Sequence, residues 1–398
     1  MSFRKRNVGL SGSTRSDGPA AAAAAVPNYS KPQVIQLPGV RPSPVDGRPT
    51  TSTGTASLDA LLAGHSGLAL GSTILIEESG TTDYAGALLR FYAAEGLLQG
   101  HHVHVVALPE QWGRELPGVV AVGESEKRGE STTPVAETEK MKIAWRYESL
   151  GQFGARERLT STTSQPGPDG VSVPGPPTTF CHTFDLTKRL VHPASSKLDF
   201  FPLDTNPKRP PFATILDRLS ASMVNSAPDT VHRVVIPSLL SPALYPPWSS
   251  HPENVLQFLH GLRALFAAHP GRLTAITSLP LSLYPRSTGL VRWIELLHDG
   301  VLELSPFPHS AEGDATTPSR GLSSTTEEPP QGLLQVHRLP MLHDRGSGVG
   351  TSENDWTFTL SRRKFTIKPF NLPPVEGDMG AQQAAGEEQK GKKADLEF

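Results

Sequence analysis

The stretch from Thr50 to Tyr84 constrains the fold of this chain more than any other. It reads TTSTGTASLDALLAGHSGLALGSTILIEESGTTDY. A short helix is predicted over Leu58–Leu62, followed by a glycine-rich turn, a hydrophobic strand over Ser72–Ile76 and a polar turn. In a nucleotide-binding α/β domain, this polar turn would be the phosphate loop.

The polar turn lacks the residues that a phosphate loop needs. Such a loop uses small residues whose backbone N–H groups reach the phosphates, a lysine that neutralises their charge, and a hydroxyl that binds Mg²⁺. The lysine position falls on Asp83. A carboxylate about 4 Å from a phosphate is repelled by roughly 4 kcal/mol per charge pair at an effective dielectric of about 20, so ordinary ATP binding is not expected. The residues of this degenerate phosphate loop are Glu77, Glu78, Gly80, Thr82, Asp83 and Tyr84.

An ATPase site also needs an acidic residue that binds Mg²⁺ at the end of a buried strand. The matching strand in this sequence has no acidic residue there. His232–Leu239 is predicted to be a buried strand, and Pro237 and Ser238 stand where the acid of an ATPase would follow. Two separate parts of an ATPase site are therefore absent. The sequence predicts a chain that is not an enzyme and has no nucleotide cofactor.

Several motifs carry a resemblance to a known family. The pattern STGxxSLDxLLAGxxGLxLGSxxLIEE resembles the opening of RecA-type domains, and with the acidic turn it resembles the PAXNEB family of Elongator fourth subunits. Further matches are MKIAWRYE at Met141–Glu148, FCHTFDLTK at Phe180–Lys188 and RRKFTIKPFNLPP at Arg362–Pro374. Together these motifs sample the chain from about Thr50 to Pro374.

The resemblance implies an accessory role. Proteins of that family are RecA-like subunits that join the fifth and sixth Elongator subunits in a hetero-hexameric ring. The ring binds tRNA and associates with the catalytic subcomplex that modifies wobble uridines, and any ATPase activity belongs to the assembled ring. The family is also linked to transcription elongation, which these residues neither support nor oppose. Two alternatives stay open: an active RecA or recombinase-like ATPase with an unusual phosphate loop, and a disordered adaptor.

Composition indicates that only part of the chain packs into a core. The 36 glycines and 38 prolines exceed the usual shares of about 7% and 5%, and they occur in blocks. We expect disordered tails over 1–49 and 373–398, and a RecA-like domain over 50–372 with low-complexity insertions near 122–139, 160–178 and 305–331.

Within the domain, strands and helices alternate as in a doubly wound, mostly parallel sheet. A helix over Asp83–Leu98 and a strand over Val103–Leu108 follow the first strand, and this succession predicts a parallel pair. Leu333–Leu339 and Trp356–Ile367 are predicted to be two strands without a helix between them, so they should be antiparallel. The predicted fold class is α/β, a RecA-like sheet with C-terminal antiparallel strands.

Local basic groups are the candidate tRNA contacts. With 37 basic and 39 acidic residues, the chain has no overall charge that would attract nucleic acid. Guanidinium groups beside aromatic rings such as Trp145 and Phe365 are typical of single-stranded RNA recognition. The alternative is a solvated face beside core aromatics. The candidates are Arg146, Arg156, Arg158, Arg362, Arg363 and Lys364.

Cysteine usage and hydropathy limit the location. Cys181 is the only cysteine, which excludes an intrachain disulfide and fits a reducing compartment, so we expect cytoplasm and nucleus. No apolar run reaches the roughly 18 residues that a membrane-spanning helix needs, and we expect no membrane partner.

Two residue clusters have competing interpretations. His102 and His104 would share one face of a strand, but no third ligand is placed and no cysteine is near, so polar residues at the start of a strand are favoured over a metal site.

Glu77 and Glu78 would point to opposite sides if the strand continued. Loop carboxylates that cap the next helix are favoured over a catalytic acid/base pair.

Overall fold

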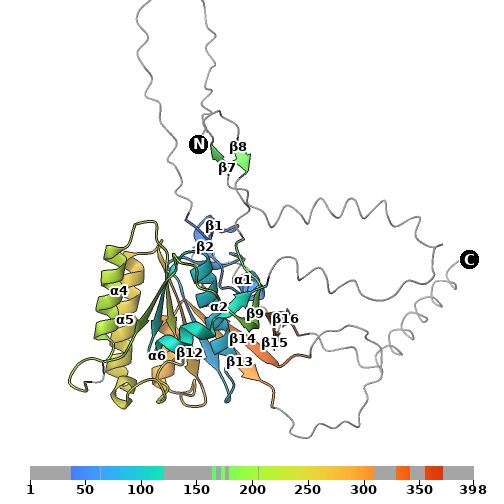
Figure 1. Ribbon diagram of the computed structural model, residues 1–398. Helices are drawn as coiled ribbons and strands as arrows, with labels where there is room; N and C mark the ends of the chain where they lie inside the picture. Colours follow the sequence, from blue (N-terminus) through green and yellow to red (C-terminus); the bar gives the residue numbers. More distant parts are fainter. Residues whose placement is uncertain are drawn as a thin grey trace, which may run out of the picture. The chain divides into compact units, whose positions relative to one another are not determined.

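The computed structural model describes residues 37–62, 64–120, 164–166, 172–174, 179–204, 206–308, 329–340 and 355–370. Its centre is a nine-stranded sheet (Figure 1). In order across the sheet, the strands are β10 (Lys197–Phe201), β5 (His102–Val106), β11 (His232–Ile236), β12 (Leu273–Pro280), β4 (Thr73–Glu78), β13 (Gly300–Pro306), β14 (Gly332–Arg338), β15 (Trp356–Leu360) and β16 (Phe365–Pro369).

The strands from β10 to β13 are parallel to one another. All residues of β4, TILIEE, are buried, and β11 and most of β12 are buried as well. Strands that are buried on both faces need helices on both faces, and branched aliphatic residues accordingly point to both sides of these strands. The predicted fold class, α/β with a doubly wound and mostly parallel sheet, is confirmed.

Helices cover both faces of the sheet. The helices on one face pack against Ile74 and Ile76 of β4. The helices on the other face pack against Leu75, the residue of β4 between these two. Figure 1 shows α4 and α5 side by side. The first face is covered by α1 (Ala56–Leu61) and α2 (Tyr84–Leu98), and the second by α4 (Ala213–Asn225), α5 (Pro252–Ala268) and α6 (Gly289–Leu297). The 3-10 helices are η1 (Glu110–Glu115) and η2 (Pro247–Ser250).

The first two predicted strands are parallel but not neighbours. β4 pairs with β12 and β13, whereas β5 pairs with β10 and β11. The strand, helix, strand succession predicted the direction correctly, but it did not reveal that β11 and β12 lie between them. The order of strands in a sheet depends on contacts between residues that are far apart in the sequence.

The C-terminal strands extend the sheet in the antiparallel sense, as predicted. β14 pairs antiparallel with β13 and with β15. The prediction of one strand over Trp356–Ile367 is wrong, because residues 361–364 form a turn and β15 pairs antiparallel with β16. Ser361 closes this turn, since its N–H donates to the carbonyl of Lys364 at 2.9 Å.

Ordered structure begins earlier than the predicted boundary at Thr50. The strands β1 (Val40–Pro42), β2 (Pro49–Thr51) and β3 (Leu68–Ala69) form a small antiparallel sheet. The predicted tail over 1–49 is therefore too long by at least residues 37–49. Thr50 and Thr51 are fully buried, which a segment rich in proline and glycine did not suggest.

The insertions are only partly described. Within 160–178, β7 (Ser164–Pro166) and β8 (Ser172–Pro174) pair antiparallel, so that stretch is not wholly a loop. The insertion predicted over 305–331 is shorter, because β13 continues to Pro306 and the N–H of Gln331 donates to the carbonyl of Phe358. Residues 122–139, Met141–Glu148 and the C-terminal tail lie outside the described residues.

The sequence pattern also failed to indicate three strands that lie before, within and after the motif at Phe180. β6 (Pro117–Val119) pairs antiparallel with β9 (Phe184–Arg189), and β10 adds an edge strand beside β5. Among the described helices, none has the length and apolar character needed to cross a bilayer.

Candidate functional site

The polar turn identified in the sequence connects β4 to α2. Glu77 and Glu78 both lie within β4, so the prediction that they are loop residues is wrong. Their side chains point to opposite faces, as expected for consecutive residues of a strand. Glu78 contacts the start of α2, and Glu77 contacts Arg286.

The carboxylate of Glu78 lies at the N-terminus of α2. Its Oε1 accepts hydrogen bonds from Thr82 Oγ1 at 2.7 Å and from the Tyr84 N–H at 2.9 Å, and its Oε2 accepts from the Ala85 N–H at 2.9 Å. Burial raises the pKa of Glu78, while these three donors favour the charged form. Free N–H groups at a helix N-terminus are where a phosphate loop binds its anion. Here a side chain of the protein occupies them, so the predicted helix-capping role is confirmed for Glu78.

The rest of the turn contains the other residues of the predicted degenerate loop. Gly80 adopts a φ of 89°, in the left-handed region that favours glycine. Asp83, at the lysine position of a phosphate loop, precedes α2, and its Oδ2 lies 3.0 Å from Arg90 Nη2. The ring of Tyr84 packs edge-on against Phe358, with centroids 4.8 Å apart. The lysine position thus holds a carboxylate that is paired with an arginine of the next helix.

Glu77 belongs to a cluster of charged side chains that the sequence did not indicate. Arg286 Nε lies 2.8 Å from Glu295 Oε1 and 3.1 Å from Glu77 Oε2. His337 Nε2 lies 2.8 Å from Glu303 Oε2, and Arg286 Nη1 lies 3.6 Å from that same oxygen. Burial, together with the nearby charge of Glu295, raises the pKa of Glu77 to about 8. Burial therefore favours the protonated form of Glu77 near neutral pH.

A cavity of about 610 Å³ opens beside this cluster. Arginines and a glutamate line it together, so its wall has no single sign of charge. Because Glu78 lies on the opposite face of the sheet and is hydrogen-bonded to α2, Glu77 and Glu78 do not form an acid/base pair. The residues that line the cavity are Arg286, Ser287, Arg292, Glu295, Leu296, Val301, His337 and Arg338.

The carboxyl end of β11 carries no acid. β11 ends at Ile236, one residue before Pro237. The carbonyl of Pro237 accepts a hydrogen bond from Tyr245 Oη at 3.1 Å, and the N–H of Ser238 donates to Ser278 Oγ at 2.7 Å. Both positions predicted for the degenerate metal-binding strand end are thus engaged in local packing.

The basic candidates for tRNA contact divide into two groups. Arg146, Arg156 and Arg158 lie outside the described residues. Arg362, Arg363 and Lys364 lie in the turn between β15 and β16, not in a strand as predicted, and all three are exposed.

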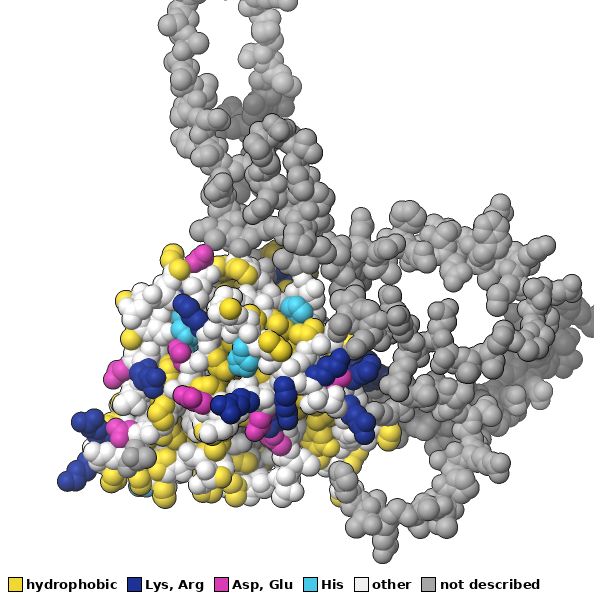
Figure 2. All heavy atoms as spheres, in the orientation of Figure 1, with side chains coloured by type: hydrophobic (Ala, Val, Ile, Leu, Met, Phe, Trp, Pro, Cys, Tyr) yellow, Lys and Arg dark blue, Asp and Glu magenta, His cyan; other side chains and the backbone are white. Residues whose placement is uncertain are grey.

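The aromatic residue beside this basic turn is part of the core. Phe365 is 4% exposed and stacks on Phe358 with centroids 5.4 Å apart, so it is not free to stack on a base. Arg363 and Lys364 line a pocket of about 190 Å³ that also contains His182. On the face shown in Figure 2, basic and acidic side chains are interspersed. The basic turn is therefore a local feature, and the predicted aromatic platform at Phe365 is wrong.

Comparison with known proteins identifies the family of this chain. Residues 33–398 match the PAXNEB protein family. "Elongator complex protein 4" of Schizosaccharomyces pombe is 33% identical over 85% of this chain and 89% of that protein. The proteins of the same name from Saccharomyces cerevisiae and Homo sapiens are 29% and 26% identical, over 87% and 89% of this chain and 79% and 84% of those proteins. The match over residues 33–398 and the shared name of these relatives confirm the resemblance seen in the sequence, and the chain belongs to the PAXNEB protein family.

Proposed function

We propose that this chain is a non-catalytic subunit of an Elongator complex. The names of its relatives support membership of that complex. The single observation that carries the non-catalytic role is the carboxylate of Glu78, which fills the N-terminus of α2. An incoming phosphate would have to displace this carboxylate and would meet Asp83 in place of a lysine.

The proposed role is to build a hetero-hexameric ring with the fifth and sixth Elongator subunits. A RecA-like sheet without a nucleotide site keeps the surfaces that pack against neighbouring subunits. Trp293 and Leu296, one helical turn apart on α6, are 54% and 51% exposed, which is unusual for large apolar residues. We propose that the ring binds tRNA and supports wobble-uridine modification in the cytoplasm and nucleus, and that the exposed basic turn at 362–364 contributes to tRNA binding.

Nucleotide titration of the isolated full chain tests the non-catalytic role. Isothermal titration with ATP and Mg²⁺ should give no saturable heat, because the anion position at α2 is already occupied. The opposing hypothesis is an active RecA-like ATPase with an unusual phosphate loop. Saturable micromolar binding that is abolished in Asp83→Ala would favour that enzyme and overturn the proposal.

Assembly tests membership of the ring. The chain is co-expressed with candidate fifth and sixth subunits, and the purified product is analysed by native mass spectrometry. A species with two copies of each of the three chains is expected. A chain that stays monomeric beside well-folded partners would contradict the proposed ring.

A further inference from the structure

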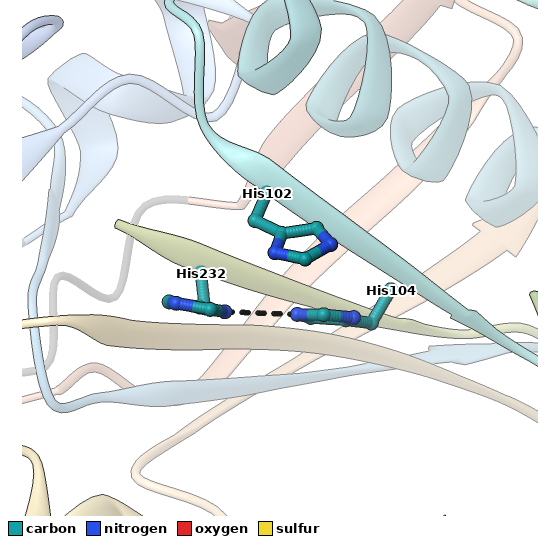
Figure 3. A group of neighbouring side chains, drawn as sticks. All are labelled: His102, His104 and His232. Carbon is teal, nitrogen blue, oxygen red and sulfur yellow. Dashed lines mark hydrogen bonds between the residues drawn. The ribbon is translucent and has the colours of Figure 1, made fainter. Parts of the chain in front are cut away.

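Three histidines meet on the face of the sheet that α4 covers. His102 and His104 come from β5 and His232 comes from β11, where it pairs in register with His102. His104 Nε2 lies 2.9 Å from His232 Nδ1, and Figure 3 shows the His102 ring lying across this contact. One nitrogen of each ring lies within 4.8 Å of the others. The prediction that His102 and His104 share a strand face is confirmed, and β11 supplies the third ligand that the sequence did not place.

The outer nitrogens of this histidine cluster face serine and aspartate oxygens. His232 Nε2 lies 2.8 Å from Ser226 Oγ, just after α4. His102 Nε2 lies 2.7 Å from Asp199 Oδ2 on β10. Histidines that bind a metal through one nitrogen are held in this way through the other, by a carboxylate or another oxygen.

One atom of the cluster has no hydrogen bond. His104 is fully buried, and its Nδ1 has no hydrogen-bond partner among the described residues. The oxygen of Asp199 lies 3.6 Å from it. His104 and His232 are fully buried and His102 is partly buried, so the cluster is shielded from solvent. A neutral imidazole is the form that binds a metal ion.

We propose that His102, His104 and His232 bind one divalent transition-metal ion, with Zn²⁺ as the preferred species. Tetrahedral Zn²⁺ with Zn–N distances of about 2.0–2.1 Å places its ligand nitrogens roughly 3.3 Å apart. The His104 and His232 nitrogens, now at 2.9 Å, need to separate by only a few tenths of an ångström. One of these two rings donates the proton in the hydrogen bond between them. When the metal binds, that ring shifts to its other tautomer, so no proton leaves the site.

Asp199 is the positioning residue of this site. Its carboxylate orients His102, and among the described residues it is the only acidic side chain in contact with the cluster. It is 44% exposed on the edge strand β10, which gives an ion a route from solvent.

Arg218 and Arg272 disfavour protonation of His104 and His232 through their charge, and they oppose a cation in the same way. We therefore expect micromolar affinity and a structural role that ties β5, β11 and β10 together.

Metal titration of the tag-free full chain tests this site. The protein is treated with a chelator, dialysed and titrated with Zn²⁺ by calorimetry and with Co²⁺ by visible absorption. One ion per chain and the intense absorption of tetrahedral Co²⁺ are expected. His104→Asn should abolish both, whereas His260→Asn, on the exposed side of α5, should leave both unchanged. Asp199→Asn should weaken binding by about 10–100-fold.

Two results would overturn the proposal. The first is a folded wild-type chain that binds no stoichiometric Zn²⁺ at concentrations well above micromolar, which would leave the cluster as hydrogen-bonded core. The second is unchanged binding in His102→Asn, which is at the more open side of the cluster and keeps the test valid if His104→Asn fails to fold. Circular dichroism of each variant separates loss of ligand from loss of fold.

Discussion

Two adjacent glutamates at the end of β4 have different roles because the strand pleat turns them to opposite faces. Glu78 accepts three hydrogen bonds at the N-terminus of α2. Glu77 is fully buried beside Arg286 and accepts no hydrogen bond among the described residues. One carboxylate therefore caps a helix through its hydrogen bonds, and burial favours the protonated form of the other.

Substitution of Glu78 by glutamine tests the first role. Glutamine keeps one acceptor but directs an amide donor toward the N–H groups of α2 and removes a charge that favours the helix dipole. Glu78→Gln should lower the free energy of unfolding by about 1–3 kcal/mol in urea denaturation. Asp83→Asn, whose side chain is exposed, is the control and should cost less than about 1 kcal/mol. Equal losses in the two variants would contradict the assigned role.

Substitution of Glu77 by glutamine tests the second role through pH. The folded-state pKa of Glu77 is raised from 4.5 to about 8, so the folded chain holds a proton that the unfolded chain releases. The stability that Glu77 contributes is complete at pH values below its unfolded-state pKa. It is lost as the pH rises through its folded-state pKa. Because glutamine does not titrate, Glu77→Gln should gain about 1–3 kcal/mol over wild type as pH rises from about 5.5 to about 8.5.

The pH comparison needs an exposed glutamate as its control. Glu115, whose side chain is 52% exposed, has no comparable burial, so Glu115→Gln should follow the wild-type curve. Unfolding curves in urea at each pH give the difference. A constant offset between Glu77→Gln and wild type across this range would show that Glu77 does not titrate as described.

At the scale of elements, one buried arginine joins β11 to three other segments. Arg233 is fully buried and faces α2. Its guanidinium donates to His101 Nδ1 at 2.9 Å, to the Tyr92 carbonyl at 3.0 Å and to Thr51 Oγ1 at 2.7 Å. The small N-terminal sheet, α2 and the start of β5 are thus connected through a single side chain.

Substitution of Arg233 by lysine tests this connection. An ammonium group cannot span the three acceptors that the planar guanidinium reaches. Each unsatisfied buried acceptor costs about 1–3 kcal/mol, so Arg233→Lys should destabilise the chain by roughly 2–4 kcal/mol. Arg209→Lys, in an exposed segment, should change stability by less than about 0.5 kcal/mol in the same urea titration. A loss for Arg233→Lys no larger than that of the control would contradict the argument.

At the scale of the whole molecule, two surface features of the described residues bear on the proposed function. The outer side of α6 exposes Trp293 and Leu296, while charged side chains of both signs are distributed over the face in Figure 2. Both features are compatible with the assembly and the local nucleic-acid contact proposed above.

The α6 surface gives a prediction for ring assembly. Trp293→Lys should reduce incorporation of the chain into the ring with the fifth and sixth subunits, because a charge would be buried against the neighbouring subunit. Its effect on the stability of the isolated chain should be small, since Trp293 is 54% exposed. Val224→Lys on α4, where the valine is 76% exposed, is the matched control. Equal incorporation of both variants in native mass spectrometry would exclude this surface of α6 from the interface.

The basic turn gives a prediction for tRNA binding. Removing two charges in Arg363→Ser/Lys364→Ser should weaken tRNA binding by the assembled ring. The slope of log affinity against log salt should become shallower by about 0.7–0.9 for each phosphate that these side chains no longer neutralise. Lys208→Ser/Arg209→Ser removes the same charge from another exposed segment. If both double variants bind tRNA equally weakly, the effect is one of net charge and not of this turn.

Local signals in the sequence were sufficient to predict the alternation of strands and helices and the parallel core. A run of branched aliphatic residues, or the residue type at a fixed distance from a strand, can be recognised without knowledge of any partner. The prediction that Glu78 caps the next helix succeeded for the same reason, because its partners Tyr84 and Ala85 are only six and seven residues further along the chain.

Contacts between residues that are distant in sequence became known only from the folded chain. Arg286 reaches Glu77 because it follows β12, which pairs with β4, and His232 reaches His104 because β11 lies beside β5. The turn at 361–364 and the strands β1 and β2 were also mispredicted, since short polar or proline-containing segments gain their order from pairing with other strands. Strand order in the sheet is set by the burial of whole faces, which no single segment encodes.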